Sequence, residues 1–275
     1  MVIKLNIQKV IESEELINFL FFPKPFQHPI QESNNLRILR IQVEDNIYIS
    51  GLFHIINKKL PTLMIFHGNA ETSEVYNYYI KDFLSLNVNI AVFDYRGYGF
   101  SNGVPTIKNL IEDSTIIYKE FKKYLESNSF NPEVFVMGRS LGSLVAGEIG
   151  KQFSEDPLGF IFESSIADTY KAMQDLFFIK VDLDKENKDF LSKYTNISKL
   201  PLIKRPTLII HGIKDNIVSL YHPFLIGLLL PKNIPKKVVL IKDADHNTIM
   251  LFKSEYFGPL RIFIKKYKNN RKLIF

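Results

Sequence analysis

The sequence predicts an α/β protein built on a mostly parallel, doubly wound sheet. One indication is a set of short, almost entirely apolar runs, because strands buried on both faces show no polar alternation. A second indication is that longer helical segments separate these runs, as crossovers between parallel strands require. The apolar runs lie at residues 62–68, 89–97, 134–140, 158–165, 207–212 and 236–246.

Two further features complete the predicted architecture. Residues 36–43 and 46–55 alternate in polarity and are separated by Glu44-Asp45, which predicts an N-terminal antiparallel hairpin. Residues 165–206 are too many for a plain crossover, so we expect a short helical cap insertion over the sheet. The expected helical connectors are residues 72–86, 106–127, 142–153, 219–230 and 248–268.

The length of 275 residues suits one domain with a sizeable core, so we expect a single domain over residues 1–275. Residues 1–35 would be an N-terminal extension that packs on the body of this domain. Within it, residues 17–26 ("INFLFFPKPF") are apolar and aromatic. We expect them to pack on their own domain, with peripheral membrane or lipid contact as the alternative.

Composition excludes several classes of site. The chain contains no cysteine, which removes disulfides, thiolate metal sites and a cysteine nucleophile. The net charge of +6 is spread along the chain, and the dense basic run at 265–272 is typical of a solvated helix end. We therefore expect no nucleic-acid partner.

No targeting segment is visible in the sequence. No run reaches the eighteen or more apolar residues of a membrane span. Residues 1–22 carry acidic side chains where a signal peptide needs an apolar stretch. These observations predict a cytoplasmic protein.

Ser140 stands at the end of a predicted buried strand, in "VFVMGRSLGS" (134–143). A sharp turn from strand to helix strains the serine backbone, and side chains two positions before and after it would collide with strand or helix. Gly138 and Gly142 remove those collisions and leave the serine oxygen projecting. The helix that begins at Leu141 directs its dipole and free N–H groups at this oxygen. We interpret Ser140 as a nucleophile.

A nucleophilic serine needs a base and an acid that orients the base. His246 follows the last predicted strand, and Asp215 follows the strand before it. The chain order Ser140, Asp215, His246 is the one used by folds with a serine at such a turn. Asp168 is the rival acid, whereas Asp243 and Asp245 are too close to His246 in sequence to reach its far nitrogen.

Acyl transfer also needs hydrogen-bond donors for the developing oxyanion. The backbone N–H of Leu141 is one candidate. The loop at 67–70 supplies the second, by position from Asn69, with Ala70 as the alternative. His67 and His211 are interpreted as structural, and no role is assigned to the remaining histidines, which are His28, His54 and His222.

Five segments together resemble the α/β-hydrolase superfamily. They are "HGNA" (67–70), "DYRGYGFSNG" (94–103), "GRSLGS" (138–143), "HGIKDNIV" (211–218) and "DADHN" (243–247). The resemblance covers roughly residues 36–268 and is greatest to single-domain serine hydrolases that include acylglycerol lipases and acyl-protein thioesterases (depalmitoylases). It implies an α/β-hydrolase fold with Ser140 as nucleophile, Asp215 as acid and His246 as base, and with an oxyanion hole formed by Asn69 and Leu141. Asp94 and Arg96 are implied to be structural.

The predicted function is hydrolysis of carboxylic esters or thioesters of a small acyl substrate, through an acyl-enzyme and without a metal or organic cofactor. The alternatives are amide hydrolysis or acyl transfer by the same triad, and a binding protein that kept the fold. The apolar residues of the cap insertion, among them Tyr170, Phe177 and Phe178, either line an acyl pocket or fasten the insertion to the core.

Overall fold

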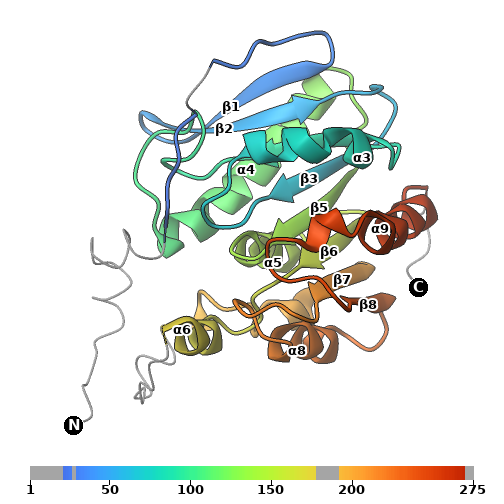
Figure 1. Cartoon of the computed structure of the whole chain (residues 1–275). Helices are drawn as coiled ribbons and strands as arrows, with labels where there is room; N and C mark the ends of the chain where they lie inside the picture. Colours follow the sequence, from blue (N-terminus) through green and yellow to red (C-terminus); the bar gives the residue numbers. More distant parts are fainter. Residues whose placement is uncertain (1–20, 27–28, 178–191, 270–275) are drawn as a thin grey trace.

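The computed structural model describes residues 21–26, 29–177 and 192–269 (Figure 1). Within this part of the chain, eight strands form one sheet in the order β1-β2-β4-β3-β5-β6-β7-β8. Strand β2 runs antiparallel to both β1 and β4, and all other neighbours are parallel. The predicted mostly parallel sheet with its antiparallel N-terminal hairpin is therefore confirmed.

Strands β3 to β8 agree with the apolar runs of the sequence, but all except β7 end earlier than the run does. Residues that follow the strands, such as His67 and Ser140, belong to the loops at the carboxyl ends of the parallel strands. The strands are β1 (Leu36–Glu44), β2 (Ile47–His54), β3 (Thr62–Phe66), β4 (Asn89–Phe93), β5 (Val134–Arg139), β6 (Gly159–Glu163), β7 (Thr207–Gly212) and β8 (Lys236–Ile241).

Helices cover both faces of the sheet (Figure 1). Their bounds are η1 (Ser73–Tyr79), α3 (Ile80–Leu84), α4 (Ile107–Ser127), α5 (Gly142–Gln152), α6 (Thr169–Phe177), η2 (Leu200–Leu202), α8 (Tyr221–Leu229), η3 (Ile249–Leu251) and α9 (Lys253–Tyr267), the η elements being 3₁₀ turns. No helix among the described residues is both long and apolar enough to cross a bilayer.

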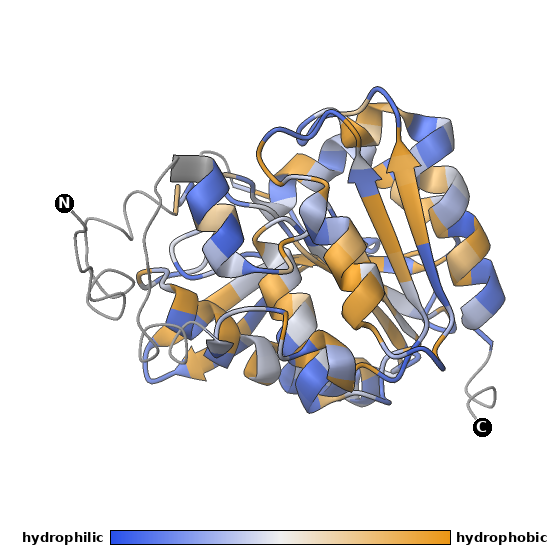
Figure 2. Cartoon of the chain, turned by 90° about the horizontal axis from the view of Figure 1, so that it is seen from below, coloured by the Kyte–Doolittle hydropathy of each residue, from blue (hydrophilic) through white to orange (hydrophobic). Residues whose placement is uncertain are grey.

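The core has two parts because successive residues of the central strands face opposite sides of the sheet. Met64 and Phe66 of β3 pack with α4, α5 and α8. Leu63 and Ile65, which alternate with them, pack with α3 and α9 on the other face. All four side chains are fully buried. Figure 2 shows the same pattern, with largely apolar strands and helices that carry both apolar and polar residues.

The cap insertion contributes the short helix α6 and a return segment to η2. Ser219, just before α8, donates a hydrogen bond to Asp175 of α6 at 3.1 Å. In the return segment, Asn196 donates to the backbone carbonyl of Ser143 in α5 at 3.0 Å. The described part of the cap is therefore fastened to the body beside the helix that follows Ser140.

The described residues 21–26 of the N-terminal extension pack on the body of the domain. Phe21 is buried in the core, and Pro25 forms an isolated parallel bridge with Gly99. These contacts place the described part of the apolar stretch against its own domain. The remainder of that stretch, 17–20, lies outside the described residues.

Candidate active site

Ser140 follows the last residue of β5 and has a backbone φ of 49°, in the left-handed region that strains a residue with a side chain. The two flanking positions must be glycine because a side chain at either one would collide with nearby backbone atoms. A Cβ on Gly138 would lie 2.5 Å from the carbonyl oxygen of Gly142, and a Cβ on Gly142 would lie 2.1 Å from the carbonyl oxygen of Phe66. The turn can close only because both positions lack a side chain.

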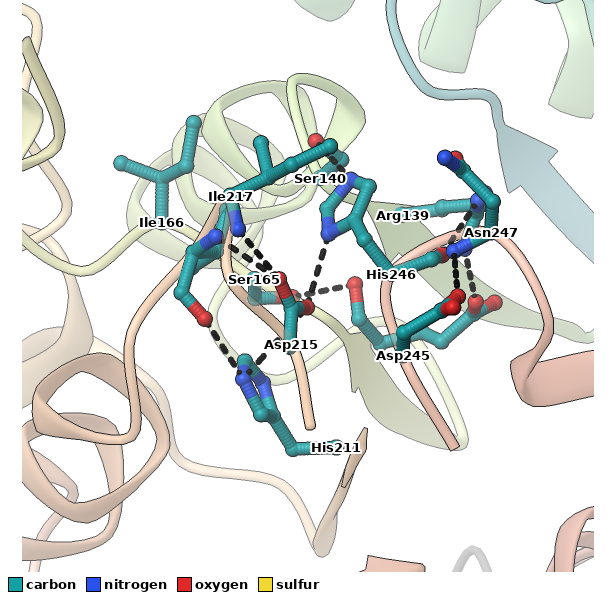
Figure 3. A network of polar contacts seen from close by, with 12 residues as sticks. Arg139, Ser140, Ser165, Ile166, His211, Asp215, Ile217, Asp245, His246 and Asn247 are labelled. Carbon is teal, nitrogen blue, oxygen red and sulfur yellow. Dashed lines mark hydrogen bonds and ion pairs between the residues drawn. The ribbon is translucent and has the colours of Figure 1, made fainter. Parts of the chain in front are cut away.

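The structure brings Ser140, His246 and Asp215 together from three different loops (Figure 3). His246 Nδ1 lies 2.7 Å from Asp215 Oδ2, and His246 Nε2 lies 3.0 Å from Ser140 Oγ. A carboxylate can only accept, so Nδ1 carries the proton and Nε2 is left to accept from the serine hydroxyl. All three residues are buried, each 7% exposed. The arrangement therefore prepares the serine to lose its proton to the imidazole.

The carboxylate of Asp215 is held by groups other than the histidine. The backbone N–H groups of Ile217 and Val218 donate to its Oδ1 at 3.0 and 2.8 Å. Burial alone would raise the pKa of Asp215, but the hydrogen bonds from His246 and Val218, with the nearby rings of His246 and His211, hold the pKa below its usual value. Asp215 therefore stays ionised opposite the imidazole.

The other acids expected as candidates have hydrogen-bond or ion-pair partners other than the imidazole of His246. Asp168 accepts a hydrogen bond from the N–H of Lys171 at 3.1 Å and so caps the start of α6. Asp243 pairs with Lys214 at 2.8 Å, and Asp245 accepts from the N–H of Thr248 at 2.8 Å. Asp215 is thus the carboxylate that contacts the base.

The two expected oxyanion donors lie on the loops on either side of Ser140 Oγ. Leu141 precedes the first residue of α5, and among the described residues no hydrogen bond occupies its backbone N–H. On the other loop, the side-chain oxygen of Asn69 accepts from the N–H of Ala70 at 2.9 Å and from the hydroxyl of Tyr98 at 2.8 Å. The N–H of Ala70 is therefore already engaged in a hydrogen bond.

Arg139, immediately before Ser140, is a feature that the sequence reading did not identify. It is 2% exposed and forms ion pairs with Glu71, at 2.7 Å, and with Glu163. Its Nη2 donates to the backbone carbonyl of His246 at 2.9 Å. Glu71 in turn accepts from the N–H of Gly68 at 2.9 Å. One buried guanidinium therefore joins the loop of Asn69, the turn of Ser140 and the loop of His246.

A cavity of about 340 Å³ opens beside Ser140. Apart from His246, the described residues that line it carry no ionisable side chain, and most of them are apolar. They are Phe21, Phe22, Asn69, Ala70, Ile107, Ser140, Leu141, Leu144, Ile166, Thr169, Ala172, Met173, Ile217, Val218, His246 and Asn247. The cavity is suited to an apolar, uncharged group attached to the reacting carbonyl.

The residues predicted to line an acyl pocket have different positions. Tyr170 is not among the lining residues; it packs against the core, and its hydroxyl accepts from Gln174 at 2.8 Å. Phe177 ends α6, but its side chain and the whole of Phe178 lie outside the described residues, so their place at the pocket stays a prediction. From the described part of the cap, Ala172 and Met173 of α6 line the cavity.

The remaining described histidines have structural contacts. His67 Nδ1 lies 2.7 Å from the carbonyl of Gly68, and His211 Nε2 lies 2.9 Å from the carbonyl of Val218. His222 Nδ1 accepts from the N–H of Ala167 at 3.2 Å. Burial lowers the pKa of His222, and also that of His54, to about 4, so both are neutral near pH 7.

Known proteins share sequence and fold with this chain. Residues 57–181 match a family model described as serine aminopeptidase, S33 (Hydrolase_4). The human alpha/beta hydrolase domain-containing protein 17B is 27% identical over 210 residues, which cover 74% of this chain and 66% of that protein. The Xenopus laevis protein 17C is 24% identical over 244 residues, which cover 87% of this chain and 73% of that protein. The chain spans about two thirds of the length of the curated relatives it matches.

Solved esterase structures share the fold. The esterase Pf2001 of Pyrococcus furiosus superposes with a TM-score of 0.66 at 22% identity, covering 85% of this chain and 93% of that one. Est1E of Butyrivibrio proteoclasticus, with ferulic acid bound, superposes with a TM-score of 0.68 at 17% identity, covering 84% of this chain and 100% of that one.

Proposed function

Because this chain shares the α/β-hydrolase fold and resembles hydrolases of that superfamily in sequence, we propose that it is a hydrolase that cleaves carboxylic esters or thioesters of apolar acyl groups, with Ser140 as the nucleophile. The observation that carries the proposal is the hydrogen-bonded chain from Ser140 through His246 to Asp215, at 3.0 and 2.7 Å, beside an apolar cavity.

The chemistry follows the positions of these groups. Ser140 Oγ attacks the carbonyl carbon of the substrate while its proton passes to His246 Nε2, and Asp215 stabilises the imidazolium that forms. The N–H groups of Leu141 and Asn69 donate to the oxyanion. Collapse of the tetrahedral intermediate breaks the bond to the alcohol or thiol, which leaves with the proton from Nε2. Water then attacks the acyl-Ser140 ester by the same route and releases the carboxylic acid.

The lining of the cavity favours this proposal over an aminopeptidase, the activity in the description of the matching family model. A free α-ammonium group needs a carboxylate close to the scissile bond, and no Asp or Glu is among the described lining residues. No Lys or Arg is among these residues either, so a phosphate or carboxylate next to the acyl group has no cationic partner in the described part of the lining. A neutral acyl ester or thioester satisfies the site as described.

Covalent labelling tests the nucleophile. A fluorophosphonate probe is expected to label the wild-type chain and to leave Ser140→Ala unlabelled. Ser164→Ala is the matched control, because Ser164 also follows a strand, is buried and has a positive φ of 43°. Labelling of Ser140→Ala at the wild-type rate would contradict the assignment.

A series of p-nitrophenyl esters and the corresponding thioesters tests the acyl group. If the acyl chain enters the cavity, kcat/KM is expected to rise with chain length by up to about 4-fold per added methylene, until the cavity is full. An equal kcat/KM from acetate to octanoate would exclude an apolar acyl substrate and leave a hydrolase of small esters.

A further inference from the structure

We propose that the N-terminal strap, residues 21–26, is the wall of the acyl cavity that selects chain length, and that Phe22 is its selecting residue. This inference rests on the proposed function, because it names which part of the cavity discriminates among acyl chains. The strap is remote in sequence from the triad. The nearest site residue along the chain is Asn69, in the loop after β3.

The strap is held in place by backbone contacts with the loop after β4. Gly99 donates its N–H to the carbonyl of Lys24 at 2.9 Å, and Phe26 donates its N–H to the carbonyl of Gly99 at 3.1 Å. The ring of Phe26 packs edge-on against Phe100, with centroids 4.4 Å apart. These contacts fix the register of the strap, so the two residues that precede Pro23 are presented at the cavity.

Those two residues contribute apolar side chains to the cavity in different ways. Phe21 is 2% exposed and belongs to the core, so it forms a fixed part of the wall. Phe22 lines the same cavity but is 52% exposed. An aromatic ring that is half exposed at a cavity still has apolar surface that a bound chain can cover.

The backbone of Phe22 links this wall to the oxyanion loop. Its N–H donates to the side-chain oxygen of Asn69 and to the hydroxyl of Tyr98, both at 3.1 Å. Tyr98 also donates to the same oxygen of Asn69 at 2.8 Å. The backbone of Phe22 is therefore anchored beside the predicted oxyanion residue, and its side chain enters the cavity at a fixed point of the chain.

The facing walls complete a channel for an acyl chain. Leu141 and Leu144 come from the turn and helix that follow Ser140, and Ala172 and Met173 come from α6 of the cap. An alkyl chain that starts at Ser140 and lies in this cavity is in contact with aliphatic groups and with the strap. Chains long enough to cover the exposed part of Phe22 gain binding free energy that shorter ones do not.

Two substitutions of Phe22 with opposite effects test the proposal by the chain-length profile of kcat/KM, from acetyl to decanoyl p-nitrophenyl esters. Phe22→Ala is expected to lower kcat/KM for the octanoyl ester more than for the acetyl ester, so that the ratio of octanoyl to acetyl kcat/KM falls by about 10-fold. Phe22→Trp is expected to move the optimum to shorter chains, because the larger ring fills part of the cavity. Since Phe22 is half exposed, neither change disturbs the core.

Phe26→Ala is the matched control. Phe26 belongs to the same strap, but its ring packs on Phe100 and it is not among the residues that line the cavity. Its profile is expected to coincide with that of the wild type. An equal loss of the octanoyl preference in Phe26→Ala and Phe22→Ala would overturn Phe22 as the selecting residue.

The outcomes separate this inference from the proposed function. If the wild type hydrolyses the esters and prefers long chains, but Phe22→Ala and Phe22→Trp keep the wild-type profile, the strap does not select the chain. If the wild type neither reacts with a fluorophosphonate nor hydrolyses any ester of the series, the proposed function itself is wrong.

Discussion

The guanidinium of Arg139 donates a hydrogen bond to the backbone carbonyl of His246 at 2.9 Å, although the two residues are 107 positions apart in the chain. Arg139 directly precedes Ser140, so this contact ties the loop of the base to the turn of the nucleophile. Glu71 and Glu163 flank the guanidinium and compensate its burial. We infer that Arg139 is a positioning residue that sets the distance between His246 Nε2 and Ser140 Oγ.

Arg139→Lys tests this inference, because lysine keeps the charge but cannot bond all three partners at once. We expect kcat to fall by about 10²-fold with little change in KM, since a small displacement of the base costs that much. The measurement is steady-state kinetics together with the rate of fluorophosphonate labelling of the folded fraction.

Arg96→Lys provides the control for loss of a paired arginine away from the site. Arg96 pairs with Asp113 through two hydrogen bonds at 2.7 and 2.8 Å. This variant is expected to lower Tm without changing kcat. If Arg139→Lys behaved in the same way, Arg139 would be a purely structural residue.

The acid is tested by comparing Asp215→Asn with Asp168→Asn. Asparagine at 215 cannot hold the Nδ1–H tautomer of His246, so kcat is expected to fall by about 10⁴-fold, as in other serine triads. Asp168 caps α6, and asparagine caps helices equally well, so Asp168→Asn is expected to leave kcat close to the wild-type value. A large loss of kcat in Asp168→Asn with little loss in Asp215→Asn would reverse the assignment.

The sheet and the contacts of the triad could be predicted because their signals are local in sequence. Buried strands appear as apolar runs, and the turn at Ser140 needs glycine at 138 and 142 for reasons confined to a few residues. Strand ends of a parallel sheet lie at one edge, so Asp215 and His246 could be expected near the serine before any distance was known.

The walls of the cavity could not be predicted in the same way, because segments far apart in the chain form them. Tyr170 and Met173 both belong to α6, but Met173 faces the cavity while Tyr170 packs on the core. The role of Phe22 depends on the pairing of the strap with Gly99, for which the sequence has no local signal. The sequence does contain a signal for Arg139. It is a charged residue at the end of the buried strand β5, and it lies in register with Glu163 at the end of the neighbouring strand β6.

Gly142→Ala is expected to lower the free energy of unfolding by at least about 2 kcal/mol and to reduce kcat. The added Cβ would lie 2.1 Å from the carbonyl oxygen of Phe66, so the backbone at Phe66 must move. The loop that carries Asn69 begins at His67, the residue after Phe66, so this movement also affects the predicted oxyanion hole. Urea unfolding and ester kinetics measure the two effects.

Gly227 in α8 is the matched control for this substitution. A Cβ at this position would lie 3.4 Å from Val238 and 3.9 Å from Ile209, which are ordinary van der Waals distances, so Gly227→Ala is expected to stabilise the helix by about 0.5–1 kcal/mol. Equal stabilities of the two alanine variants would contradict the close-contact explanation for Gly142.

We expect the folded protein to lose stability at mildly acidic pH because His222 is buried in its neutral form. Its Nδ1 accepts from the N–H of Ala167, next to Ile166 of the cavity wall, and burial lowers its pKa to about 4. Unfolding exposes the ring and restores a pKa of about 6.5, so the unfolded chain binds more protons between these values. Folding stability therefore falls as pH decreases through this range, and His222 alone accounts for about 2 kcal/mol between pH 7.5 and 5.

His222→Asn removes this titration and keeps an oxygen acceptor for the N–H of Ala167. We expect urea unfolding of the variant to show a smaller loss of stability between pH 7.5 and 5 than the wild type, by about the same 2 kcal/mol. His54, whose pKa burial also lowers to about 4, still titrates in the variant, so part of the acid sensitivity persists. Parallel pH profiles of the two proteins would mean that His222 is not held neutral in the folded state.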